Sequence, residues 1–170
     1  MNDANQTASV PDRATILALL QESYAGPAWH GPSVLEALDG VNAATAARKL
    51  EAQRNSIWEL VLHLAHGRHL LTERTLDASA GAFPRDIREP WWPVSPPDTG
   101  DEAWHADLAL LDERQRAMMD AIERATPAKL ARVPERSEHS VGRQLLGMAL
   151  HDTYHAGQIR LLALALGDTV

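Results

Sequence analysis

The spacing of apolar residues along the chain predicts four long helices. In four stretches the apolar side chains recur at intervals of three and four residues, which gathers them on one face of a helix. These stretches are residues 13–24, 56–76, 99–126 and 140–166. Strand-like alternation of useful length does not occur between them. We therefore expect an all-α fold whose helices share one core.

Serine or threonine followed three residues later by glutamate marks several helix starts. In such a capping box each side chain bonds the backbone N–H of the other residue, which satisfies donors that the helix leaves free. Three pairs fit this pattern: Ser33 and Glu36, Ser56 and Glu59, and Thr99 and Glu102. The first pair predicts a short helix ahead of the second long one.

Residues 80–100 interrupt the helical pattern. They contain five prolines and the adjacent Trp91 and Trp92, and proline removes a helical N–H and clashes with the preceding turn. We expect an up-down four-helix bundle with this long Pro/Trp-rich crossover loop between its second and third helices. The two tryptophans have three interpretations, namely a cap over a pocket, a dimer contact, or packing against helix ends.

The composition restricts the classes of partner. The chain has 170 residues, a size typical of one domain, and a formal net charge of -7 without a basic cluster. A nucleic-acid partner is therefore not expected. The opening MNDANQTASVPD is polar, and no apolar run approaches the roughly 18 residues of a membrane span. We expect a flexible segment at residues 1–11, one domain at residues 12–170, no membrane partner and a cytoplasmic location.

Two histidines on the fourth helix indicate a metal site. His151 and His155 are four residues apart, so they are offset by about 40° around the axis and about 6 Å along it and can converge on one ion. His63, in the middle of the second long helix, is the natural third ligand because facing helices bring their inner side chains together. Three protein ligands leave a position open for water or substrate.

Polar neighbours are candidates to support these ligands. The apolar seam of the fourth helix places Asp152 and His155 inward, with Tyr154 and Gln158 nearby. Histidines that bind metal usually donate their second ring N–H to such groups, and we expect Asp152 and Gln158 to take this part. The alternative interpretation is a core pair in which Asp152 and His155 bind each other or backbone carbonyls.

Other residues on the second and fourth helices have less specific interpretations. His66 and His69 point away from His63 around the helix and are predicted to lie at the surface. Gly67 and Gly147 each lie one turn from a candidate ligand. Their missing side chains either leave room beside the metal or let the helices pack closely.

Three segments resemble the DinB-like family of metal-binding four-helix bundles, which includes thiol-dependent S-transferases and stress-related members. They are WHGPSVLEAL, SIWELVLHLAH and HDTYHAGQIRLL. The resemblance covers essentially the whole chain and implies His63, His151 and His155 as ligands of zinc or nickel. It also implies that the chain could form a homodimer. Gly67 departs from the pattern, because relatives often carry a tryptophan or another bulky residue there.

The leading functional hypothesis is a divalent-metal-dependent thiol S-transferase in detoxification or the stress response. The chain has no cysteine, so the thiol would come from a low-molecular-weight co-substrate. One alternative is hydrolysis of a small ester or amide, with His30 or Tyr154 assisting proton transfer. Another is a non-enzymatic, stress-related protein that binds metal or a small molecule. His30 is either a pocket acid/base or a turn histidine bonded to backbone.

Overall fold

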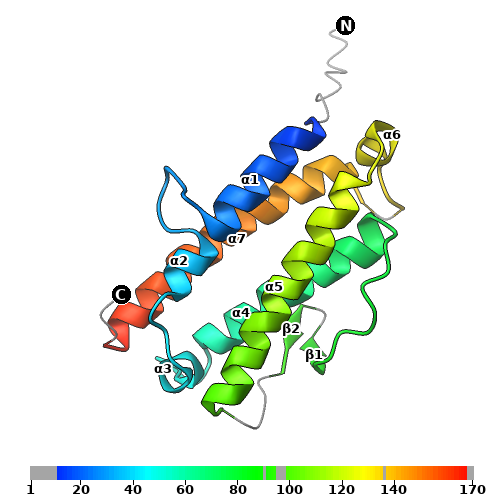
Figure 1. The fold of residues 1–170 in the computed structure, drawn as a ribbon. Coiled ribbons are helices and arrows are strands. Elements are labelled where there is room, and N and C mark those ends of the chain that lie inside the picture. Colours follow the sequence, from blue (N-terminus) through cyan, green and yellow to red (C-terminus); the bar gives the residue numbers. More distant parts are fainter. Residues whose placement is uncertain (1–10, 90, 95–98, 136, 168–170) are drawn as a thin grey trace, which may run out of the picture.

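The computed structural model describes residues 11–89, 91–94, 99–135 and 137–167. Within them the fold is helical apart from one small sheet, which confirms the all-α prediction (Figure 1). Residues 1–10 of the predicted flexible segment lie outside this description. The elements are α1 (Arg13–Ala25), α2 (Val34–Leu38), α3 (Ala43–Ala47), α4 (Ile57–Leu70), the π-helical turn η1 (Leu71–Thr75), β1 (Ile87–Glu89), β2 (Trp92–Pro93), α5 (Asp101–Glu123), α6 (Pro127–Ala131) and α7 (Val141–Ala165).

The four long helices pack side by side in an order that differs from their order in the chain. α1 packs against α7 and α5, and α4 packs against α5 and α7. α1 and α7 run in one direction, and α4 and α5 run in the opposite one (Figure 1). The direction therefore alternates from α1 to α4 and from α5 to α7, but α4 and α5 are parallel, so the predicted up-down order is wrong for this pair. A parallel pair needs a long return connection, which explains the length of the segment between them.

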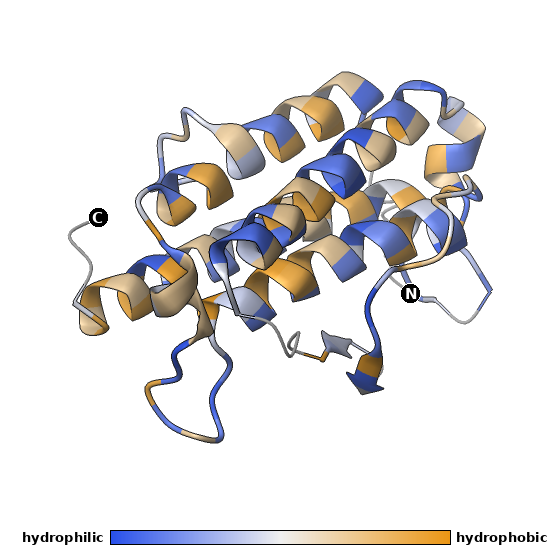
Figure 2. Cartoon of the chain, turned by 60° about the horizontal axis from the view of Figure 1, so that its bottom comes forward, coloured by the Kyte–Doolittle hydropathy of each residue, from blue (hydrophilic) through white to orange (hydrophobic). Residues whose placement is uncertain are grey.

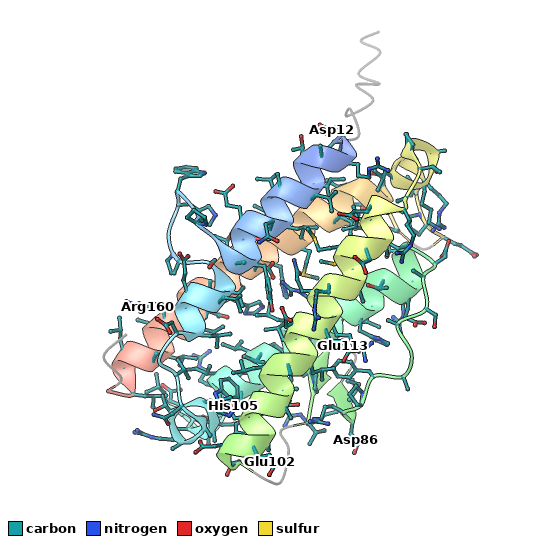
Figure 3. The ribbon with its side chains drawn as sticks, in the orientation of Figure 1. Asp12, Asp86, Glu102, His105, Glu113 and Arg160 are labelled. Atoms are coloured by element: carbon teal, nitrogen blue, oxygen red, sulfur yellow. The ribbon has the colours of Figure 1, made fainter. Side chains whose placement is uncertain are left out.

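The helix starts follow the predicted capping boxes in two of three cases. At α2 and α4, Ser33 and Ser56 accept from the backbone three residues on, and the glutamate side chain bonds back in each case. The third box is wrong, because α5 begins after Gly100 with no side-chain cap bond. Asp101 and Glu102 lie in its first turn instead, where negative charge is favourable beside the helix dipole. Asp12, which caps α1, is labelled in Figure 3.

The crossover contains a feature that the hydrophobic pattern did not reveal. β1 and β2 form a two-stranded antiparallel sheet in which Ile87 pairs with Pro93. Arg85 ties the connection to α5 through an ion pair of 2.5 Å with the buried Asp107, which also accepts a bond of 2.7 Å from Trp58 Nε1 on α4. Trp92 packs against the apolar core. The crossover is thus held onto α4 and α5.

Each long helix contains both hydrophobic and hydrophilic residues. Figure 2 shows hydrophobic and hydrophilic residues alternating along every one of them. No helix among the described residues is both long enough and apolar enough to cross a membrane.

Candidate metal centre

The antiparallel contact between α4 and α7 brings three predicted ligands together. His63 Nε2 and His155 Nε2 each lie 3.0 Å from His151 Nε2. The candidate ligand atoms of the three residues all fall within 4.8 Å of one another. His155 is buried, and the other two rings are partly covered. We call these three residues the histidine cluster.

His63 is oriented by the crossover. Its Nδ1 lies 2.6 Å from the backbone oxygen of Trp91, and its ring stacks on Trp92 with centroids 4.1 Å apart and planes at 14°. A carbonyl oxygen only accepts hydrogen bonds, so Nδ1 is the nitrogen that carries the proton. The lone pair of His63 Nε2 therefore points into the cluster.

Gln158 orients His155 in the same way, as predicted from its position on the helix. Its Oε1 accepts from His155 Nδ1 at 2.7 Å, and its Nε2 donates to Tyr154 Oη at 3.0 Å. The proton on Nδ1 leaves the lone pair of His155 Nε2 facing the cluster. Tyr154 is exposed, and among the described residues it meets the cluster through Gln158 and through a T-shaped contact with the His155 ring.

His151 completes the cluster, but it cannot donate a hydrogen bond to both of its neighbours. Its Nε2 lies between two nitrogen lone pairs, and one ring proton can bond only one of them. Its Nδ1 is buried without a hydrogen-bond partner among the described residues. The nitrogen lone pairs that face inward thus outnumber the protons available to them. A bound cation would satisfy these lone pairs. A tetrahedral zinc ion with bonds of about 2.0–2.1 Å needs nitrogens roughly 3.3 Å apart, close to the two distances of 3.0 Å from His151 Nε2.

The three imidazoles are held in the neutral form that a metal requires. Burial lowers the pKa of His151 to about 3, and repulsion from His155 and His63 in their protonated forms and from Arg68 acts in the same direction. Burial lowers the pKa of His155 to about 4 and that of His63 below its usual range. Neutral imidazole offers its lone pair without losing a proton first.

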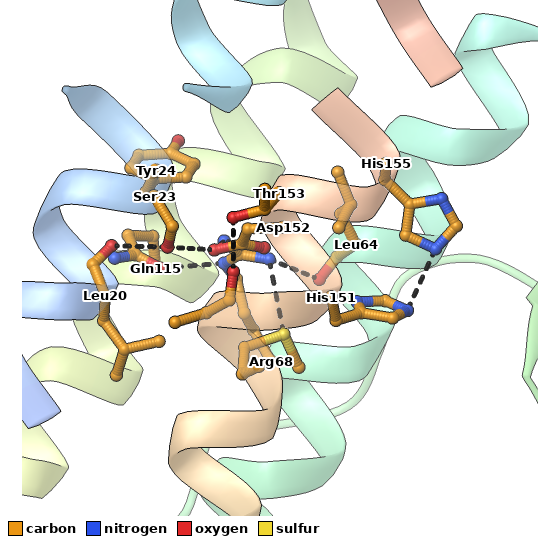
Figure 4. A network of polar contacts seen from close by, with 12 residues as sticks. Leu20, Ser23, Tyr24, Leu64, Arg68, Gln115, His151, Asp152, Thr153 and His155 are labelled. Atoms are coloured by element: carbon orange, nitrogen blue, oxygen red, sulfur yellow. Dashed lines mark hydrogen bonds and ion pairs between the residues drawn. The ribbon is translucent and has the colours of Figure 1, made fainter. Parts of the chain in front are cut away.

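Asp152 lies elsewhere, contrary to the prediction that it supports the histidines. It is fully buried and accepts two hydrogen bonds of 2.8 Å from Arg68 Nη2 and one of 3.1 Å from Ser23 (Figure 4). Consecutive helical residues point about 100° apart, so Asp152 faces α1 and Arg68 instead of the rings. The alternative pairing of Asp152 with His155 is likewise not what the structure shows. Arg68, a charged residue inside an apolar seam, was the signal that the sequence interpretation missed.

The prediction that His66 and His69 lie at the surface is wrong for His66. His66 is buried, with 5% of its surface exposed, and His69 is half-buried. Both rings pack on Phe83, at 4.9 and 5.4 Å between centroids. The crossover covers this face of α4, which the helical pattern alone did not indicate.

The structure does not bring His30 to the cluster. His30 is exposed and lines a separate pocket beside Trp29, Leu146 and Thr153. Its ring meets Trp29 edge-on. Neither a bond to the turn backbone nor a contact with the cluster is present among the described residues, so we leave His30 out of the site.

Two pockets reach the cluster. One, of about 840 Å³, is lined by His63, His151 and both Gly67 and Gly147. The other, of about 460 Å³, is lined by His155 and its neighbours Tyr154, Gln158 and Trp92. An added Cβ would meet nothing within 4 Å at Gly147 but would lie 3.1 Å from Met148 Cε at Gly67. Gly147 thus leaves open space, and Gly67 permits close packing.

Comparisons with known proteins agree with this architecture. The family model described as the DinB superfamily matches residues 29–159, a span that includes all three histidines. Searches of curated proteins and of solved structures gave no significant match.

Proposed function

The chain belongs to the DinB superfamily, and we propose that it is a divalent-metal-dependent thiol S-transferase in detoxification or the stress response. In this proposal His63, His151 and His155 hold zinc or nickel, for which neutral imidazoles are suitable ligands. The thiol is a low-molecular-weight co-substrate, and the electrophile is a small molecule. Homodimerisation, a single domain over residues 12–170 and a cytoplasmic location remain predictions.

The observation that carries the proposal is the convergence of three Nε2 atoms, with two of the three rings held from outside the cluster. Trp91 O and Gln158 Oε1 accept the Nδ1 protons of two rings. Such outer partners set the tautomer and raise the basicity of the ligand nitrogen. A bundle that needed only packing at this point would gain more from apolar side chains, since buried polar groups without partners destabilise it.

The arrangement supports transfer of a thiol because three protein ligands leave room for one more. His63, His151 and His155 would hold the divalent ion, whose charge would lower the pKa of a thiol. Such a thiol would give its proton to water and form a carbon–sulfur bond to the electrophile, and the leaving group would depart with the bonding pair. The chain has no cysteine that could compete as a ligand or nucleophile. The two pockets at the cluster offer separate places for the two substrates.

The test joins metal analysis to an activity panel. We expect one zinc or nickel ion per chain, and consumption of thiol above background with at least one electrophile. His155→Ala should lose both, whereas His105→Ala should keep both, because His105 is exposed on α5 (Figure 3). The transferase proposal fails if the wild type does not exceed background for any thiol. Turnover of a small ester alone would favour a hydrolase, and metal that raises the Tm without turnover would favour a binding protein.

A further inference from the structure

The larger pocket at the histidine cluster is a groove between two antiparallel elements, and we refer to it as the groove. Its lining follows α4 and η1 on one side and α7 on the other. From the cluster outward, these residues are His63, Gly67, Leu71 and Arg74 on the first side, and His151, Gly147 and Gln144 on the second. Positions three and four apart share one face of a helix, so each row is continuous.

The groove is long compared with a minimal thiol. Arg74 follows His63 by eleven residues, which corresponds to roughly 16 Å along a helix axis. The middle of the groove is small or apolar, with Gly147, Leu70 and Met148 in its wall. A ligand whose sulfur lies at the cluster therefore passes uncharged surface before its other end reaches Arg74.

Arg74 is a positively charged residue at the end of the groove that lies farthest from the histidine cluster. It is exposed, and it makes no hydrogen bond or ion pair with any other residue that the structure describes. Nearby arginines are engaged, since Arg68 binds Asp152 and Arg132 binds Asp77 and the backbone of Thr75. Glu135 also lines the groove without pairing with Arg74.

We propose that the groove binds an extended thiol that ends in a carboxylate, and that Arg74 holds this carboxylate. The inference rests on the proposed function, because the sulfur end is assigned to the metal. A guanidinium binds a carboxylate through two parallel N–H donors, a geometry that an uncharged end group cannot match. The negative charge of Glu135 disfavours a ligand with several anionic groups, which leaves a single carboxylate as the better fit.

Calorimetric titration of the zinc-loaded protein with a matched pair of thiols tests the anchor. The probes are mercaptooctanoate and mercaptooctanol, which differ in the end group. We expect the wild type to bind the acid about tenfold more tightly, as one charged hydrogen-bonded contact provides. Arg74→Gln should abolish this preference and leave the affinities for mercaptooctanol and for zinc unchanged. Arg124→Gln, which removes an equal charge at the exposed end of α5, should retain it.

A second variant tests whether the thiol lies along the groove. Gly147→Leu places a side chain into open space and should weaken both thiols more than tenfold while zinc still binds. Equal affinity of the wild type for acid and alcohol, or a preference that survives Arg74→Gln, would overturn the assignment of Arg74. Unchanged thiol binding in Gly147→Leu would show that the groove does not bind the thiol. Absence of zinc uptake by the wild type is a different result, because it contradicts the proposed function itself.

Discussion

Two consecutive residues of α7 belong to polar groups of opposite character. Asp152 and Arg68 form a closed group, in which a fully buried carboxylate receives three hydrogen bonds and the guanidinium also bonds Gln115 and the Leu64 carbonyl. His151 belongs to an open group of inward nitrogens that lack donors. A satisfied network specifies the core, whereas an unsatisfied one requires a ligand. Burial alone therefore does not distinguish a structural polar group from a functional one.

Acid should have the largest effect, and it should act through the buried histidines of the open group. Without metal, we expect the free energy of unfolding to fall as the pH drops from about 6.5 toward 4 and to stay level above 6.5. The unfolded chain binds protons on its histidines in that range, whereas His151 and His155, with pKa values lowered to about 3 and about 4, do not when folded. His66 and His69, whose pKa values are also lowered by burial, add to the effect.

Urea denaturation at a series of pH values measures this dependence. With zinc in excess the decline should begin at lower pH, because protons must then displace the metal. A free energy of unfolding that stays constant from pH 7 to pH 5 without metal would contradict the burial of neutral imidazoles.

Breaking the closed group should be the next largest effect. Asp152→Asn leaves the buried Arg68 without its counter-charge and should lower the free energy of unfolding by about 3–5 kcal/mol. Asp112→Asn, at a half-exposed ion pair on α5, should cost less than about 1 kcal/mol. Chemical denaturation of both variants without metal provides the comparison. A similar small loss for both would show that Arg68 finds another partner.

Breaking the open group should have its main effect only when metal is present. Zinc at a thousand times its Kd should stabilise the wild type by about 4 kcal/mol, and His155→Ala should lose most of this gain. Without metal the same variant should lose clearly less than this gain, because it gives up only the hydrogen bond to Gln158 and the packing of one ring. The Tm with and without zinc measures both. A large loss in the metal-free protein would assign the cluster to the core.

The smallest effect should come from a residue that touches the cluster from outside. Gln158→Leu removes the acceptor for His155 Nδ1 and should weaken zinc binding roughly tenfold to a hundredfold. Leu161→Gln, on the exposed side of α7, serves as the matched control and should leave zinc affinity unchanged. Calorimetric titration with zinc distinguishes the two. Equal affinities would mean that Gln158 does not hold the ring.

The helical pattern was sufficient to predict the relative positions of residues within one helix. Periodicity predicted the four long helices, and the four-residue spacing of His151 and His155 predicted a shared face, which the structure confirms. Gln158 was a candidate because it lies on the same polar flank of that helix as His151 and Tyr154. His63 required only that the second and fourth helices face each other.

Contacts that depend on non-local packing were not predictable in the same way. The Trp91 oxygen is a backbone atom of the crossover, so no side-chain pattern reveals its bond to His63. The burial of His66 depends on where Phe83 comes to rest. Asp152 was correctly placed in the core but given the wrong partner, because a seam predicts depth and does not identify the facing side chain.

X-ray absorption spectroscopy of the zinc-loaded protein shows which atoms surround the metal. We expect one zinc ion per chain, coordinated by three imidazole nitrogens at about 2.0–2.1 Å and one further light atom. Addition of a thiol should replace that light atom with sulfur at about 2.3 Å. A zinc environment dominated by carboxylate oxygens, or one that is unchanged in His155→Ala, would show that the three histidines do not hold the metal.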